Sequence, residues 1–400
     1  MSTIKKFYPN EKGKIMLEKL KQGYSAAKTG IASAGKGIAT AGKGISTAMI
    51  VVYALLSLLL LCVLMWVYNK LTLDNSNCTK MNKLYKNFPT ISTINIGNDE
   101  FSHNFRDYYI KTAYNCCSAG TVKNDFVNIC ALKNCIRQGV RCLDFEIYSV
   151  NNSPVVAVSS KNSFDVKETY NTVSFANAMS IISDYAFSGS TCPNPGDPLI
   201  IHLRIMSNNK PIYDIMANTL HSALSRRLLG KEHSYENNGK NLGQTPLKSL
   251  MGKVIIIADK TNPLFSDTLL NEYVNIASNS VFMRALRFHD VKFTPDMPEL
   301  KEFNKKNMSI VLPDVSTNVS NPSSNLSLMY GCQMVGLSLQ SYDTSLEFYN
   351  EMFDLAGSAF VLKPEELRFV PVVIPEPPPA NPEYSYKTRD IKADYYSFSI

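Results

Sequence analysis

The chain has 400 residues, of which 45% are hydrophobic and 19% charged, so it is long enough for one large domain with appendages. Its net charge of +7 comes entirely from Met1–Thr47, which holds nine lysines and two glutamates, and the remainder is neutral. This distribution excludes a basic nucleic-acid-binding domain, and we expect no nucleic-acid partner.

Residues 1–47 form a basic tail with a seven-residue repeat, "GIASAGK" followed by "GIATAGK". Apolar residues between Leu17 and Ile45 recur at spacings of three and four, which predicts one narrow apolar stripe on a helix. One interpretation is a helix that lies on an anionic membrane or binds a helical or protein partner through residues 17–45. The other is a disordered basic tail that only sets membrane topology.

The stretch "MIVVYALLSLLLLCVLMWVY", Met49–Tyr68, has no charge and no proline. About 20 such residues cross a bilayer as a helix, so we predict a transmembrane helix over residues 48–68. A signal peptide is the competing interpretation, but its apolar core is shorter, at about 7–15 residues, and its basic region is short. The lysine-rich tail should stay cytosolic, which places the C-terminal part in the lumen, outside the cell, or at a virion membrane.

Eight cysteines follow the predicted membrane helix, an even number that permits up to four disulfides in an oxidising compartment. Free thiols in a reducing compartment are the alternative. No cysteine or histidine cluster has the spacing of a zinc site.

After a polar stalk at residues 69–104, strand-like and helix-like segments alternate, which favours a parallel α/β sheet closed into a (β/α)8 TIM-type barrel. Residues 261–281 are expected to link two half barrels, and residues 369–400 to form a proline-rich C-terminal tail. The expected strands lie at 106–114, 140–148, 153–159, 198–206, 252–259, 282–293, 308–313 and 332–340, and the expected helices at 124–139, 174–187, 211–229 and 344–356.

Several segments carry a resemblance to phosphatidylinositol-specific phospholipase C. "CIRQGVRCLDFEIY", "PLIIHLRI" and "LMGKVIIIADK" resemble its X region over residues 105–260, while "YGCQMVGLSLQSYD" and "FVLKPEELR" resemble its Y region over residues 282–368. The resemblance implies a TIM barrel that hydrolyses phosphoinositides with two histidines and a calcium ion. The family's functional positions fall on Tyr114 and Val158 for the histidines, on Asn115, Asp144, Glu146 and Arg204 for the calcium ligands, and on Ile257 and Asp259 for lysines that hold substrate phosphates.

Both histidines and one acidic ligand are therefore replaced. Valine cannot transfer a proton, and a phenol is a poor proton acceptor near neutral pH. We expect Arg204 to pair with Asp144 and Glu146 in a buried cluster that takes the place of calcium, with no metal bound. His202, two residues before Arg204, is expected to be a core histidine one layer deeper than the mouth rather than a base.

The resemblance and these replacements suggest a membrane-anchored, phospholipase C-like protein that is catalytically inactive and serves as a structural or binding ectodomain. A virion or organelle membrane, with a large DNA virus as the source, suits its composition. One alternative is an active phosphoric diester hydrolase with a rearranged site built from the cluster and His202, which would need calcium. A second is a module that binds lipid or inositol phosphate. Cys116 and Cys117 are expected to form disulfides near the mouth, with Cys130, Cys135 and Cys142 as candidate partners.

Overall fold

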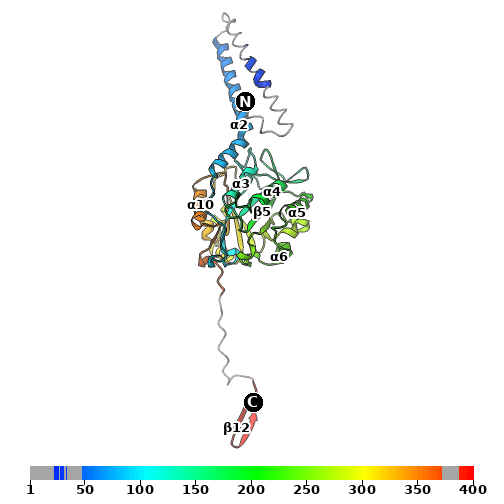
Figure 1. Ribbon diagram of the computed structural model, residues 1–400, viewed down its shortest axis with the longest axis vertical. Helices are drawn as coiled ribbons and strands as arrows, with labels where there is room; N and C mark the ends of the chain where they lie inside the picture. The colour runs from blue at the N-terminus through cyan, green and yellow to red at the C-terminus, as the bar shows by residue number, and fades with distance from the viewer. Residues whose placement is uncertain (1–21, 27, 31–32, 34–46, 372–386) are drawn as a thin grey trace. The chain divides into compact units, whose positions relative to one another are not determined.

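The computed structural model of the chain describes residues 22–26, 28–30, 33, 47–371 and 387–400 (Figure 1). It divides into two compact units, Met1–Thr72 and Leu73–Ile400. Helix α2 spans Thr47–Leu84, and its stretch Met49–Leu84 is long and apolar enough to cross a membrane. The predicted tail helix over residues 17–45 falls largely outside the described residues, although 22–26 and 28–30 are helical.

Eight parallel strands in the second unit form a nearly closed barrel in the order β7-β6-β5-β2-β1-β10-β9-β8. Neighbours along this path are hydrogen-bonded, whereas β7 and β8 meet at the seam without a ladder between these two strands. The predicted TIM-type α/β barrel is therefore confirmed. The barrel strands are β1 (Tyr108–Ala113), β2 (Cys142–Val150), β5 (Leu199–Ile205), β6 (Val254–Asp259), β7 (Ile276–Ser278), β8 (Met283–Arg287), β9 (Met308–Leu312) and β10 (Met334–Leu337).

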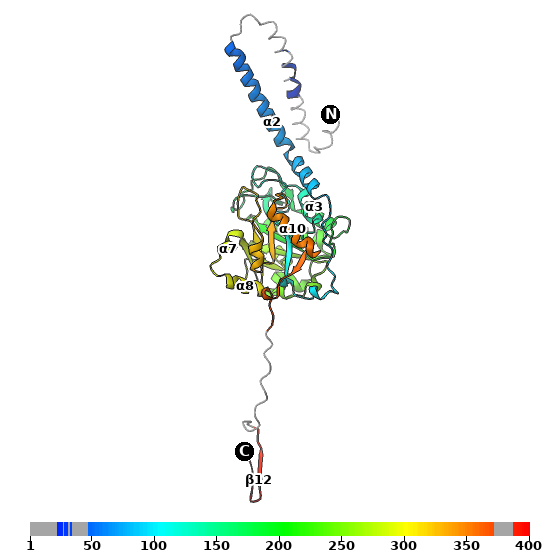
Figure 2. The same cartoon turned by 90° about the vertical axis from the view of Figure 1, so that its left-hand side faces the viewer.

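Helices cover the outside of the barrel. In Figure 1, α4 and α5 lie on the side opposite α10, and Figure 2 shows α7 and α8 together on one side of the barrel unit. Helix α7 contacts β8 and β9, and α8 contacts β9. Short 3-10 helices join several of these elements. The α-helices of the barrel unit are α3 (Ile129–Arg137), α4 (Phe175–Tyr185), α5 (Pro211–Leu224), α6 (Ser234–Gly239), α7 (Phe288–Lys292), α8 (Met297–Lys306), α9 (Asn325–Met329) and α10 (Thr344–Ala356).

The central strands form where the sequence is mostly apolar. Every residue of β5 is buried, and so is β6 up to its last residue, because side chains fill the barrel on one face and helices cover the other. Polar residues mark the helix ends. The side chain of Ser174 accepts a hydrogen bond at the start of α4, that of Asp343 does so at the start of α10, and Gly357 ends α10 at a φ of 64°.

Two strand predictions were wrong in detail. The segment 153–159 is not a barrel strand: β3 (Ser153–Val156) folds back antiparallel on β2 and continues the hairpin to β4 (Val173–Ser174), while β2 pairs directly with β5. The eighth barrel strand is β7, which lies in the segment predicted as a linker. In addition, β11 (Phe360–Leu362) pairs antiparallel with β1.

The predicted polar stalk at residues 69–104 was also wrong. Helix α2 continues through it to Leu84, and Met81, Tyr85, Ile91 and Ile94 are buried in the barrel's hydrophobic core. Some polar groups of this segment bond to the barrel; for example, the Tyr85 hydroxyl donates to the Leu339 carbonyl at 2.6 Å. From Leu73 onward this segment is therefore part of the barrel unit.

The C-terminal tail contains a hairpin that the sequence interpretation missed. Strands β12 (Asp390–Ala393) and β13 (Tyr396–Ser399) pair antiparallel, and their side chains are largely exposed. The proline-rich residues 372–386 before it lie outside the described part of the chain.

Candidate functional site

The predicted site residues meet at the carboxyl ends of strands β1, β2 and β5. The register of β2 and β5 pairs Asp144 with His202 and Glu146 with Arg204. Residues two apart on a strand point to the same face, so all four side chains point into the barrel. Asn115 follows the end of β1 and completes the group.

The guanidinium of Arg204 lies at the centre of this cluster and donates four hydrogen bonds. Nε and Nη2 bind the two carboxylate oxygens of Asp144 at 3.0 and 2.9 Å. Nη1 binds Oε2 of Glu146 at 3.1 Å, and Nη2 also binds Oδ1 of Asn115 at 2.6 Å. All four residues are buried, so the predicted contacts between Arg204 and the two carboxylates are present.

Two tyrosines, Tyr148 and Tyr114, contact the cluster. The hydroxyl of Tyr148 donates a hydrogen bond to Oε1 of Glu146. The ring of Tyr114, at the family's first histidine position, lies with its centre 5.0 Å from the guanidinium carbon of Arg204, which is within the range of a cation–π contact. Tyr114 therefore packs against the cation.

The turn after β1 brings Asn115 to Asp144. Asn115 has a φ of 47°, a left-handed conformation that asparagine tolerates better than most residues. Its backbone N–H donates to Oδ2 of Asp144 at 3.1 Å, while the backbone N–H of Cys116 donates to the Asp144 carbonyl at 3.0 Å. Asp144 is thereby hydrogen-bonded through both its side chain and its backbone.

The pKa values of Asp144 and Glu146 are shifted in opposite directions. Burial would raise the pKa of Asp144, but the opposing effects of Arg204 and His202 are larger and hold that pKa well below its usual range. Burial raises the pKa of Glu146, since Arg204 and Tyr148 compensate only in part. The difference follows from geometry, because Asp144 accepts two of the guanidinium's bonds and Glu146 only one. The carboxylates in turn raise the pKa of Arg204, despite its burial.

His202 is engaged on both ring nitrogens. Nδ1 is 2.8 Å from Oδ1 of Asp144, and Nε2 is 3.0 Å from the Ser278 hydroxyl on β7. The side chain is fully buried. This arrangement is that of a hydrogen-bonded core histidine, and its ring does not line the cavity described below.

Val158, the other family histidine position, is buried in the hydrophobic core just beyond β3. The two positions on β6 at which the resemblance implies phosphate-binding lysines differ from one another. Ile257 is buried, whereas Asp259 lies at the mouth and accepts hydrogen bonds from Thr261 and from Asn279 at 2.8 Å.

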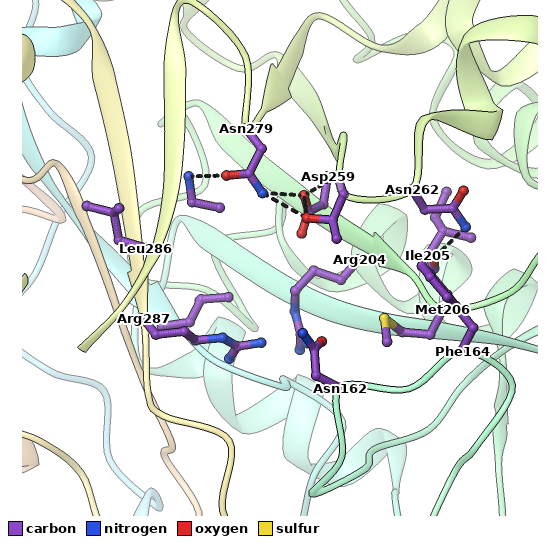
Figure 3. Close-up of a pocket in the computed structure, with 13 residues that line it drawn as sticks. Asn162, Phe164, Arg204, Ile205, Met206, Asp259, Asn262, Asn279, Leu286 and Arg287 are labelled. Atoms are coloured by element: carbon purple, nitrogen blue, oxygen red, sulfur yellow. Dashed lines mark hydrogen bonds between the residues drawn. The ribbon is translucent and has the colours of Figure 1, made fainter. Parts of the chain in front are cut away.

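A cavity of about 220 Å³ opens at the mouth above the cluster (Figure 3). In Figure 3 the side chains of Asn162 and Arg287 point toward that of Arg204. Arg287 ends β8 and donates a hydrogen bond to the Pro313 carbonyl at 3.0 Å. Among the lining residues, the sequence interpretation missed Asn162, Asn279 and Arg287. Asn279 follows the last residue of β7 and Arg287 ends β8. A position at a strand end was the signal that could have identified these two, because active sites of such barrels are built there.

The donor set does not fit the calcium ion that the family resemblance implies. Calcium takes six to eight oxygen ligands, and here the oxygen atoms of Asn115, Asp144 and Glu146 accept hydrogen bonds from a fixed guanidinium. A divalent ion at the same place would lie against a positive charge. Elsewhere in the described residues, no group of three or more histidine, cysteine or acidic side chains could hold a metal.

The disulfides predicted for Cys116 and Cys117 are absent, and that prediction was wrong. Both thiols are free and buried, and burial raises the pKa of each, so neither is an activated nucleophile. The disulfide present joins Cys78 to Cys130, while Cys135 and Cys142 are free. The spacing of the cysteines could not indicate this pairing, because Cys78 approaches the barrel only through the fold of α2.

Comparison with known proteins matches two family models. "Phosphatidylinositol-specific phospholipase C, X domain" covers residues 101–260, and "Phosphatidylinositol-specific phospholipase C, Y domain" covers residues 272–366. A search of curated proteins found no match.

Among solved structures, L. pealei PLC21 aligns with a TM-score of 0.57 and 18% identity over 69% of this chain and 39% of its own. S. officinalis PLC21 aligns with a TM-score of 0.57 and 16% identity over 70% of this chain and 39% of its own. At these identities the likeness supports the barrel fold, and the chain matches only 39% of the length of either protein.

Proposed function

We propose that this chain, which belongs to the phosphatidylinositol-specific phospholipase C family and carries its X and Y domains, is a membrane-anchored member that does not hydrolyse phosphodiesters. Helix α2 would supply the anchor, with the barrel unit as a binding or structural ectodomain at an organelle or virion membrane. The observation that carries the proposal is the guanidinium of Arg204, which is bound by Asn115, Asp144 and Glu146.

Family chemistry needs an activated inositol hydroxyl, charge neutralisation at the phosphate and proton transfer. Calcium, when bound, would lower the pKa of that hydroxyl and neutralise phosphate charge. Here the carboxylates that would hold the ion are already bound by the guanidinium of Arg204. At the histidine positions, Val158 has no titratable group and Tyr114 packs on the guanidinium. His202 is buried below the cavity with both nitrogens bonded, so it is not placed to serve as a substitute base.

The test is release of inositol phosphate from phosphoinositide vesicles by the full chain, with and without calcium, beside an active family member. We expect release at the level of the protein-free blank in both conditions. Turnover that Asp144→Ala abolishes would overturn the proposal and support the alternative of a hydrolase with a rearranged site.

A second candidate function, binding of a phosphate-bearing headgroup without turnover, is favoured by the mouth cavity. The guanidinium of Arg287 lines the cavity, and the side-chain amide of Asn162 lines it as well (Figure 3). Guanidinium groups suit phosphate oxygens.

Calorimetric titration with inositol 1,4,5-trisphosphate, a soluble probe, would test this binding. Arg287→Ala should weaken it, whereas Arg284→Ala should not. Arg284 lies on the same strand, but its guanidinium pairs with Glu299 at 2.7 Å and does not line the cavity. Absence of binding by the unmodified chain would remove this candidate.

A further inference from the structure

The sequence contains five asparagines in the pattern Asn-x-Ser/Thr, which accepts N-linked glycans. They are Asn77, Asn151, Asn307, Asn318 and Asn325. A chain this rich in asparagine, serine and threonine carries several such patterns by chance, so the pattern alone assigns nothing. A glycan is bulky and must stand in solvent, which means that the fold decides which of the five can carry one.

Three of the five patterns lack either an exposed amide or an exposed hydroxyl. Asn77 is buried, and its Nδ2, the atom that would carry the sugar, donates a hydrogen bond to a buried carboxylate at 2.9 Å. The pattern at Asn307 ends in Ser309, which is buried within β9. The pattern at Asn325 ends in Ser327, which is buried on α9. These three patterns are therefore poor acceptors in the fold.

The other two patterns lie in exposed loops. Asn151 belongs to the two-residue turn between β2 and β3, and both Asn151 and Ser153 are exposed. Asn318 lies in the loop between β9 and α9, and both Asn318 and Ser320 are exposed. The turn by itself favours asparagine, because Asn151 and Asn152 have φ values of 52° and 57°. The exposure of the serine together with the asparagine therefore carries the argument.

The disulfide Cys78–Cys130 is a second, independent observation that points to this modification. Disulfides persist in oxidising compartments such as the lumen of the endoplasmic reticulum, where N-linked glycans are also added. The free cysteines of the barrel unit are all buried, so such a compartment would not force them to pair with outside thiols. A barrel that enters this lumen would meet the glycosylation machinery.

From this exposure and this disulfide, we infer that Asn151 and Asn318 carry N-linked glycans. The inference rests on the proposed ectodomain. In each case Nδ2 forms a bond to the anomeric carbon of an oligosaccharide and gives up one proton to the transferase. The bond from that carbon to a lipid-linked pyrophosphate breaks, and the lipid pyrophosphate leaves with the electron pair. Both loops follow the carboxyl end of a barrel strand, so the glycans would stand at the end of the barrel where the cavity opens.

Peptide mapping of the full chain, purified from the membranes of cultured animal cells, tests both positions. Peptide-N-glycosidase removes an N-linked glycan and leaves aspartate in place of the asparagine. The untreated sample is the control for spontaneous deamidation. We expect aspartate at positions 151 and 318 only after treatment, and asparagine at positions 77, 307 and 325 throughout.

Substitution of the serines provides matched variants that leave both asparagines in place. Ser153→Ala and Ser320→Ala should each remove one glycan, and the double variant should show no change in mobility on treatment with the glycosidase. Ser153→Thr and Ser320→Thr keep the pattern and should retain both glycans. Because both serines are exposed, these substitutions should leave the fold intact.

A tag added after Ile400 separates failure of this inference from failure of the ectodomain proposal. Unmodified asparagine at both positions, or glycans on the other three patterns instead, would overturn the inference if the tag reacts with antibody only after detergent opens sealed membranes. The ectodomain proposal would then still stand. Modification at only one position would remove the other from the inference. A tag that reacts without detergent would overturn the ectodomain proposal, and with it the inference.

Discussion

At the scale of single residues, Arg204 changes what the barrel mouth can do. An acidic residue at this position would add negative charge to Asp144 and Glu146 and favour a metal ion. A guanidinium supplies a permanent positive charge and a planar set of N–H donors, which match the carboxylate oxygens around it. The cluster therefore already holds one fixed positive charge between its two carboxyl groups.

We predict that Arg204→Met destabilises the fold by about 3–5 kcal/mol, because it leaves two buried carboxyl groups without their cation. Chemical unfolding of the full chain would measure this loss. Arg284→Met is the matched control, since its partner Glu299 is half exposed, and it should change stability by less than about 1 kcal/mol. An equal, small effect of both substitutions would show that the cluster contributes little.

Lys111 on β1 leads to a prediction about pH. It is fully buried beneath α10, its Nζ has no hydrogen-bond partner in the described structure, and burial lowers its pKa from 10.5 to about 8 despite the attraction of Asp354. Between these two values the unfolded chain keeps the proton and the folded chain does not. Stability from this residue therefore rises with pH across that interval.

We accordingly predict that Lys111→Met stabilises the protein at pH 7, by on the order of 1–3 kcal/mol, because the buried charge is removed. The difference in unfolding free energy between the two proteins should shrink as the pH rises from about 8 to 10.5. Unfolding curves at several pH values would show it. A difference that does not vary with pH would contradict the assignment.

At the scale of elements, helix α2 couples the apolar segment to the barrel. The disulfide Cys78–Cys130 closes a loop of 52 residues. It lies next to the hydrogen bond from Asn77 to Asp125 and to Met81, which is buried in the hydrophobic core. We predict that Cys78→Ser lowers barrel stability by about 2–4 kcal/mol, because the unfolded chain gains the freedom of that loop. Cys62→Ser should have no effect, since Cys62 is exposed on α2 and unpaired. Unchanged unfolding of Cys78→Ser would mean that the disulfide does not constrain the fold.

The elements differ in how well the sequence predicts them. The runs Leu199–Ile201 in β5 and Val254–Ala258 in β6 are continuously apolar, which predicts buried strands. Strand β7 has three residues between polar neighbours, which is too short for a periodic pattern. The segment containing β3 resembles a barrel strand in composition, and only its pairing with β2 shows it to be a hairpin.

The predicted stalk failed for a different physical reason. Asp74 and Asn77 look like solvent-exposed polar residues in the sequence, but they are bonded to Asn128 and Asp125 of the barrel. Site residues on adjacent strands could be predicted, because strand alternation and the family motifs place them together. The cavity wall could not be predicted in full, since Arg287 lies inside the longer strand predicted at 282–293 and Asn162 comes from a loop whose path depends on tertiary packing.

At the scale of the whole molecule, the described parts support an apolar helix joined to a phospholipase C-like barrel. The barrel retains the scaffold, as the matched X and Y domains show. Tyr114, Val158 and Arg204 stand where the sequence resemblance implies the family's histidines and one acidic metal ligand. Our proposals together describe a barrel joined to a membrane anchor, with a cavity suited to a headgroup and a fixed cation where the resemblance implies a metal.

The most direct test of the central proposal, that Arg204 takes the place of calcium, is the thermal unfolding of the full chain in a chelator and in millimolar calcium. Ligands that bind only the folded state raise the unfolding temperature. We predict the same unfolding temperature in both conditions. A calcium-dependent rise that disappears in Asp144→Ala would contradict the account, because it would place the ion at the carboxylates that we assign to Arg204.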